Sequence, residues 1–205
     1  MSVQVLGVLG AGGHATVVAE LAELVGWEVR FFDDATFGNG GGNEVVGTLS
    51  DALEESGING FAVAIGDNKI RQYWVTKLIA RGLHLPVLIH PSACISKSAS
   101  VLSGTVVFAQ GVVQASATIG VGSIINTAAT VDHGCVVAPF VHISPGAHIG
   151  GDVDIGERVW IGMGASVRNG TSISADIVVG AGAVVVSDLV RAGLYMGVPA
   201  RSQSD

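Results

Sequence analysis

Residues 131–151 read VDHGCVVAPFVHISPGAHIGG, and every sixth position in this stretch is Val or Ile (Val131, Val137, Ile143, Ile149). The same six-residue step continues without a break from Ile95 to Val185, which gives sixteen aliphatic β-branched positions. Four residues after most of them the side chain is small. This period fits neither the 3.6 residues of a helical turn nor the alternation of an ordinary strand. It predicts a triangular parallel β-helix whose branched side chains fill a narrow prism.

Three hexapeptides make one coil of such a prism, so residues about eighteen apart are expected to lie beside each other on neighbouring coils. Sixteen hexapeptides predict about five coils, stacked at the ~4.8 Å spacing of paired strands.

The first 90 residues follow a different pattern, in which apolar strands alternate with segments of helical period. We expect strands at 3–10, 27–34, 60–67 and 85–90 and helices at 14–26, near 50–56 and at 69–82. The glycine-rich run GNGGGNE (38–44) is predicted to be a mobile loop. The pattern indicates a Rossmann-like βαβ unit with a parallel sheet. The predicted domains are therefore residues 1–90 and 91–205.

Composition narrows the class of protein. Hydrophobic residues make up 49% of the 205 residues, but no apolar run approaches the ~20 residues of a membrane span. The formal charge of -7 disfavours nucleic acid as a partner. The N-terminus lacks the pattern of a signal peptide, and the two cysteines form no CxxC motif, so we expect a cytoplasmic protein without disulfides.

The segment GAGGHA (10–15) follows the first predicted strand and opens the first predicted helix. Its G-x-G-x-x-A spacing is typical of a phosphate cradle, and Asp33 and Asp34 stand about twenty residues on, where an acid can hold a ribose or a base. Only about 90 residues precede the repeat, which favours a mononucleotide over a dinucleotide. The alternative is that the glycines only form a tight turn and His14 caps the helix. We favour a ligand site because the two acids have no evident structural use.

Several motifs, in order along the whole chain, carry a resemblance to a known family. They are GAGGHA, the DD at 33–34, AIGDN (64–68), LIHPSA (88–93), NTAATVDHGC (126–135), FVHISPGAHIGG (140–151), IGMGASV (161–167), VVGAGAVV (178–185) and GVPAR (197–201). The chain resembles hexapeptide-repeat acyltransferases that N-acetylate nucleotide-linked amino sugars, with sialic acid O-acetyltransferases as close relatives. The resemblance implies a left-handed β-helix, acetyl-CoA as donor, no metal, and a homotrimer with active sites between subunits.

The resemblance also implies roles for individual residues. His133 matches the general base, and a histidine can accept the proton of an attacking amine at neutral pH. Acetyl-CoA is expected to contact His142, Gly151, Met163 and Ala181, and the nucleotide-sugar to contact Gly12, Gly13, His14, Asp33, Asp34 and Gly66. An N–H group near Gly151 is a candidate for stabilising the oxyanion.

Other readings of these side chains stay open. His142 also fits a packing role against Trp160, one coil away, while His148 and Arg201 fit solvated positions. Relatives usually place an acid directly after the catalytic histidine, but here that position is Gly134 and the acid, Asp132, precedes it. Because neighbouring side chains on a strand point to opposite faces, Asp132 is a doubtful replacement. An acid from another coil or subunit is the alternative.

The leading hypothesis is N-acetylation of a nucleotide-linked amino sugar, with a UDP-linked 4-amino sugar as the expected acceptor. O-acetylation of sialic acid is the nearest alternative, followed by a β-helix trimer that binds nucleotide-sugars without catalysis. Zinc-dependent carbonic anhydrases also use β-helical trimers. His142 and His148 are six residues apart and are expected on successive faces, which argues against a shared metal.

Overall fold

The computed structural model describes residues 4–34 and 44–203, and the chain divides into two compact units between Leu88 and Ile89. The predicted glycine-rich loop, apart from Glu44, lies outside the described residues. Among the helices of the described part, none is both long and apolar enough to cross a membrane.

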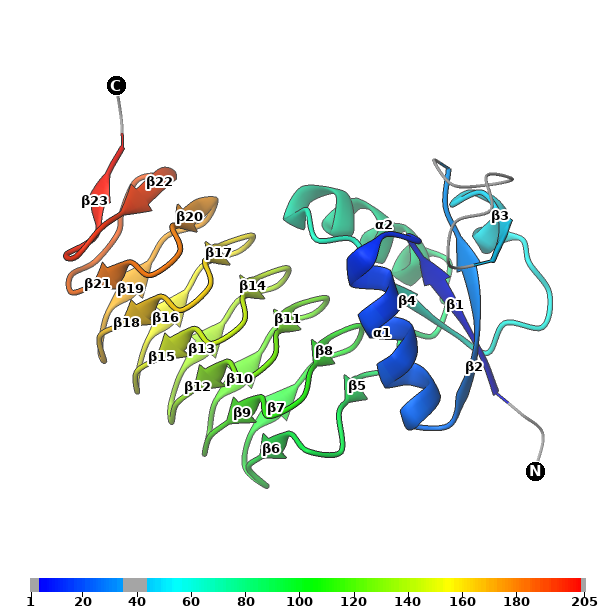
Figure 1. Cartoon of the computed structure of the whole chain (residues 1–205), viewed down its shortest axis with the longest axis horizontal. Coiled ribbons are helices and arrows are strands. Elements are labelled where there is room, and N and C mark those ends of the chain that lie inside the picture. The colour runs from blue at the N-terminus through cyan, green and yellow to red at the C-terminus, as the bar shows by residue number, and fades with distance from the viewer. Residues whose placement is uncertain (1–3, 35–43, 204–205) are drawn as a thin grey trace. The chain divides into compact units, whose positions relative to one another are not determined.

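Unit 1 is a parallel sheet with helices packed on it, as the alternating pattern predicts (Figure 1). The sheet has the order β3-β2-β1-β4, and α1 packs against β1 and β2 while α2 packs against β4. The elements are β1 (Gln4–Leu9), α1 (Gly13–Leu24), β2 (Trp27–Phe32), β3 (Val45–Gly47), the 3-10 helix η1 (Asp51–Leu53), β4 (Gly60–Val63) and α2 (Asn68–Ala80).

The ends of α2 have identifiable causes. Asp67 caps the first turn, because its Oδ1 accepts the N–H groups of Lys69 at 2.8 Å and Ile70 at 2.9 Å. At the other end Gly82 has a φ of +68°, and the N–H of Leu83 donates to the carbonyl of Leu78. The helix therefore begins one residue before and ends two residues before the predicted 69–82 segment.

Two sequence expectations for unit 1 are wrong. The helix expected near 50–56 is only η1. Thr48 and Asp51 make reciprocal hydrogen bonds at its start, as in a capping box, but the helix does not continue beyond Leu53. The strand expected at 85–90 shortens to β5 (Leu88–Ile89), and it pairs with a strand of the repeat instead of joining the first sheet. Ile89 continues the six-residue step backward from Ile95, so the repeat begins one hexapeptide earlier than we expected.

Unit 2 is a parallel β-helix with three faces built from short strands (Figure 1). Face I contains β5, β8 (Val106–Val107), β11 (Ile124–Ile125), β14 (His142–Ile143), β17 (Trp160–Ile161) and β20 (Ile177–Val179), and is extended by β22 (Gly193–Met196) and the antiparallel β23 (Arg201–Ser202). Face II contains β6 (Cys94–Ile95), β9 (Val112–Val113), β12 (Thr130–Val131), β15 (His148–Ile149), β18 (Ser166–Val167) and β21 (Val184–Val185). Face III contains β7 (Ser100–Val101), β10 (Thr118–Ile119), β13 (Val136–Val137), β16 (Asp154–Ile155) and β19 (Ser172–Ile173).

The six-residue pattern corresponds to the core of this prism. The aliphatic residue of each step is the second or last residue of its strand, and from Val107 to Val185 every one is buried. Neighbouring coils pair eighteen residues apart, as Ile119 does with Val137. Full burial of such a side chain contributes roughly 1.5–3 kcal/mol. The predicted fold class and the coil length are therefore confirmed.

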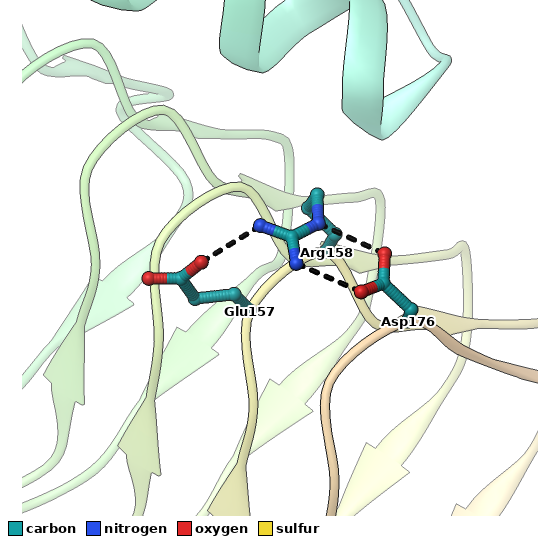
Figure 2. A network of polar contacts seen from close by, with 3 residues as sticks. All are labelled: Glu157, Arg158 and Asp176. Atoms are coloured by element: carbon teal, nitrogen blue, oxygen red, sulfur yellow. Dashed lines mark hydrogen bonds and ion pairs between the residues drawn. The ribbon is translucent and has the colours of Figure 1, made fainter. Parts of the chain in front are cut away.

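The corners of the prism need a left-handed backbone, which recurs along the chain. At one corner Phe140, Arg158 and Asp176 have φ values of 62°, 58° and 58°, eighteen residues apart. Figure 2 shows the Arg158 guanidinium held between Glu157 and Asp176, with two 2.8 Å bonds to the carboxylate of Asp176 on the next coil. These hydrogen bonds raise the pKa of Arg158 above its ordinary value. The Arg158–Asp176 ion pair therefore links the same corner of two successive coils.

Candidate functional site

His133 lies in the turn that leads from β12 on face II to β13 on face III. Its side chain is 61% exposed. The next coil places Gly151 directly against the ring, and a Cβ at this glycine would lie only 2.5 Å from both Cε1 and Nε2 of the imidazole. The glycine is required because the ring occupies the space that any side chain would need.

An acid does approach His133, from the next coil. Oδ1 of Asp152 is 3.8 Å from the ring Nδ1. Asp132, which precedes the histidine, instead accepts the main-chain N–H of His133 at 2.7 Å. The sequence left the source of a supporting acid open, and the structure brings Asp152 to the ring.

The Gly151 main chain has one occupied and one available polar group. Its carbonyl accepts the N–H of Gly170 at 2.9 Å. Its N–H makes no hydrogen bond within the described part of the chain. Because Gly151 itself lies against the His133 ring, this N–H stays the candidate donor to an oxyanion.

His142 lies on face I and is stacked between coils. Its ring is parallel to that of Trp160 on the next coil, with an interplanar angle of 6° and 5.5 Å between ring centres. Nε2 of His142 is 3.2 Å from Nδ2 of Asn126. Oδ1 of Asn126 accepts the N–H of Thr127 at 2.8 Å, so the asparagine presents its NH₂ group to the imidazole. The packing role expected from the sequence is therefore present.

A cavity of about 360 Å³ opens beside this stack. His142, Met163 and Ala181, three of the four residues expected to contact acetyl-CoA, line it. The rest of the lining is mainly apolar and comes from Ser144, Pro145, Trp160, Gly162, Val178, Val179 and Gly180. The fourth expected residue, Gly151, lies against His133 instead. A mainly apolar cavity of this size suits the chain of a thioester cofactor.

Within one chain, His133 and the cavity lie at different corners of the prism. Residues 144–145, 162–163 and 180–181 follow the strands of face I, at the corner with face II. His133 follows a strand of face II, at the corner with face III. The width of face II therefore separates the base from the cavity.

His148 lies on the outer side of face II, where its Nδ1 is 3.0 Å from the hydroxyl of Thr130. It is exposed, as expected. His142 and His148 are thus on different faces, as their six-residue separation predicts. Within the described ranges, no group of three or more His, Cys, Asp or Glu side chains is arranged to hold a metal.

The glycines of unit 1 separate into two kinds. Gly10 is structural, because its φ is +106° and a Cβ would lie 2.9 Å from the carbonyl oxygen of Ala64. A Cβ at Gly12, Gly13 or Gly66 would meet nothing within 4 Å, and none of the three has a positive φ. Gly12 is the extended N-cap of α1, and no side chain caps this helix. Open space beside the first N–H groups of a helix suits an anionic ligand.

The expectation that Asp33 and Asp34 have no structural use is wrong. Oδ2 of Asp33 accepts the N–H of Ala11 at 2.7 Å, which ties the glycine loop to the end of β2. Oδ1 of Asp34 accepts the N–H of Leu49 at 2.9 Å. A carboxylate can accept several hydrogen bonds, so these contacts do not prevent either side chain from also contacting a ligand. Their presence alone is no longer an argument for one.

His14 is part of a cluster that the sequence did not reveal. Burial and, to a smaller extent, the nearby Arg71 lower the pKa of His14 to about 4, so the imidazole is neutral at pH 7. Arg71 on α2 is almost fully buried and donates to the carbonyls of Ile65 and Gly66, both at 3.0 Å, and to Oδ1 of Asn68. Burial lowers the pKa of Arg71 to about 10, so it stays charged at pH 7. This buried cation shapes the 65–68 loop.

Comparison with known proteins identifies related chains. Residues 5–78 match the family model described as the PglD N-terminal domain. No curated protein matches the chain.

Solved structures match almost the whole length. The acetyltransferase domain of PglB from Neisseria gonorrhoeae FA1090, in complex with acetyl coenzyme A, is 45% identical, with a TM-score of 0.93 over 98% of this chain and 100% of that one. PerB from Caulobacter crescentus, in complex with CoA and GDP-perosamine, is 39% identical, with a TM-score of 0.92 over 99% of each chain. WeeI from Acinetobacter baumannii AYE, at 23% identity and a TM-score of 0.87, shares the fold.

Proposed function

Because this chain belongs to the hexapeptide-repeat sugar N-acetyltransferases, we propose that it transfers an acetyl group from acetyl-CoA to the amino group of a nucleotide-linked amino sugar. The observation that carries the proposal is the apolar cavity, which gathers the expected donor residues His142, Met163 and Ala181 at one corner of the β-helix. The relatives bound to acetyl-CoA or CoA have the same fold over nearly their whole length.

In the proposed reaction His133 is the general base. The lone pair of the sugar amine attacks the thioester carbonyl, a C–N bond forms, and the N–H of Gly151 donates a hydrogen bond to the developing oxyanion. The proton lost by the amine passes to the imidazole. When the C–S bond breaks, that proton leaves with the sulfur, so that the amide and free CoA thiol are the products.

The proposed active site needs two subunits. His133 and the donor cavity lie at opposite edges of face II, and we infer that a single copy does not use both. In a trimer of prisms packed side by side, the His133 corner of one copy can face the cavity of its neighbour. We therefore propose a homotrimer with three inter-subunit sites.

Unit 1 (1–88) supplies the acceptor site in this proposal. The nucleotide diphosphate approaches the N-terminus of α1, where Gly12, Gly13 and Gly66 leave open space. His14, Asp33 and Asp34 are proposed to contact the rest of the nucleotide-sugar. We propose a UDP-linked 4-amino sugar as acceptor, and the GDP-linked sugar bound by the Caulobacter relative is the comparison to test beside it.

The experiment follows release of CoA thiol from acetyl-CoA with three acceptors: a UDP-linked 4-amino sugar, a GDP-linked 4-amino sugar and free sialic acid. We expect release with a nucleotide-linked amine and a product heavier by one acetyl group. His133→Ala should lower kcat by roughly 10²-fold or more, while acetyl-CoA still binds. The proposal would be overturned if thiol were released only with sialic acid, or if neither nucleotide-linked amino sugar caused release.

A further inference from the structure

We propose that Asp152, on the coil after His133, is the positioning residue that orients the catalytic imidazole and supports its positive charge. The inference rests on the proposed role of His133 as general base. The sequence offers no sign of this pairing, because the two residues are nineteen positions apart and both lie in turns.

The main chain holds the two residues side by side. The N–H of Asp152 donates to the carbonyl of His133 at 2.8 Å, a bond between adjacent coils. Asp152 has a φ of +58°, a left-handed conformation that aspartate tolerates better than most residues. From this position its Oδ1 comes to 3.8 Å from Nδ1 of the imidazole. That separation is within ion-pair range and longer than a hydrogen bond.

Two glycines make the approach possible. A Cβ at Gly151 would lie 2.5 Å from the Cε1–Nε2 edge of the His133 ring. A Cβ at Gly134, the residue after the histidine, would overlap Oδ1 of Asp152. Each member of the pair thus occupies the side-chain space of a glycine on the other coil. This reciprocal fit places the carboxylate where a side chain at position 134 would begin.

The arrangement gives the two ring nitrogens of His133 different roles. With a carboxylate facing Nδ1, the neutral ring is favoured as the tautomer that carries its proton there. Nε2, over Gly151, is then the nitrogen with a free lone pair for the substrate proton. Once that proton arrives, the Asp152 carboxylate stabilises the imidazolium.

Asp132 is the competing acid, and its geometry does not fit the role. Its Oδ1 accepts the main-chain N–H of His133 at 2.7 Å, so it caps the turn. The preceding coil brings only Ala115, whose carbonyl accepts the N–H of Gly134. Asp132 and Asp152 are therefore the two carboxylates that contact His133, and the Cys135 thiol, which interacts electrostatically with both, is the other titratable group nearby.

The test compares three single substitutions of equal charge: Asp152→Asn, Asp132→Asn and Asp154→Asn. Asp154 is exposed on β16 of the same coil and is the matched control. We expect Asp152→Asn to lower kcat on the order of 10-fold, less than the ~10⁴-fold of a buried triad carboxylate, because Asp152 is 71% exposed and solvent screens the pair. KM should change little, the acidic limb of the pH profile of kcat/KM should move to lower pH, and Asp152→Glu should restore part of the rate.

A second readout does not depend on turnover. NMR of the ring nitrogens of His133, assigned by comparison with His133→Ala, should show the tautomer with its proton on Nδ1 in the unsubstituted protein, less of it in Asp152→Asn, and no change in Asp154→Asn. An unchanged ring tautomer together with an unchanged kcat would overturn the inference. Equal effects of Asp154→Asn would reduce it to a general charge effect, and a larger effect of Asp132→Asn would transfer the role to that residue. Absence of acetyl transfer by the unsubstituted protein would count against the proposed function, while the NMR signals of the ring nitrogens would still decide the pairing.

Discussion

Gly151→Ala should disable the proposed base without weakening the fold. The new Cβ would lie 2.5 Å from Cε1 and Nε2 of His133, whereas unstrained carbon contacts begin near 3.5 Å, so the ring must retreat by about 1 Å. The ring can do so at little cost because it is 61% exposed. A misplacement of this size can lower a rate about 10²-fold. We expect that loss in kcat, with a change in the free energy of unfolding of about 0.5 kcal/mol or less.

The neighbouring glycine provides the contrast. A Cβ at Gly150 would lie 2.7 Å from the main-chain nitrogen of Asn169 and 3.0 Å from the carbonyl oxygen of Val167. Main-chain atoms of a paired coil cannot swing aside. Gly150→Ala should therefore lower the free energy of unfolding by about 1–3 kcal/mol, measured as a fall in Tm.

The assay combines thiol-release kinetics with thermal unfolding for Gly151→Ala, His133→Ala and the double variant. If Gly151 acts only by making room for the imidazole, its substitution should have almost no effect once the imidazole is gone. A Gly151→Ala protein with full activity would refute the reasoning. The reasoning would also be refuted if the double variant were slower than His133→Ala by a further two orders of magnitude, because Gly151 would then have another role.

Three further predictions concern stability. The pKa of His14 is lowered from 6.5 to about 4, so the unfolded chain binds more protons in this range and stability should fall as pH drops from 6.5 towards 4, by at most about 3 kcal/mol; denaturant unfolding of His14→Gln should show a flatter pH dependence there. Arg158→Met removes both bonds to Asp176 and should lower the free energy of unfolding by about 1–2 kcal/mol, less so in 1 M salt than in dilute buffer. Ile143→Ala should lower the free energy of unfolding by about 2–5 kcal/mol because Ile143 is fully buried in the prism. For Arg158→Met and for Ile143→Ala, an unchanged midpoint of denaturant unfolding would contradict the prediction.

Predictability differed between the two units for a physical reason. In unit 2 each hexapeptide requires one branched side chain that points inward, so sixteen positions in the sequence all indicate the same fold. In unit 1 no pattern is repeated, so each element depends on its own contacts. The segment expected as a helix near 50–56 formed only η1, and the pairing of β5 with β8 moved an expected strand into the β-helix.

The residues of the candidate site were likewise easier to predict in unit 2 than in unit 1. The cavity residues His142, Met163 and Ala181 were expected from the sequence, and three coils bring them together because of the eighteen-residue spacing. Asp33 and Asp34 were expected for a reason that failed, since main-chain N–H groups already use one oxygen of each. The buried Arg71 had no signal in the sequence, because a cation within a helical pattern looks like a solvated residue.

By itself, the sequence determined the prism: a six-residue period leaves one inward position per strand, and only stacked coils can bury them all. The tertiary structure alone decided what happens at the corners. At the corners the six-residue period specifies that a turn occurs, but it does not specify where the side chains of the turn point. Their direction depends on the left-handed backbone and on which residues of the neighbouring coil are glycines. The pairing of His133 with Asp152 across two glycines arises from that contact between coils.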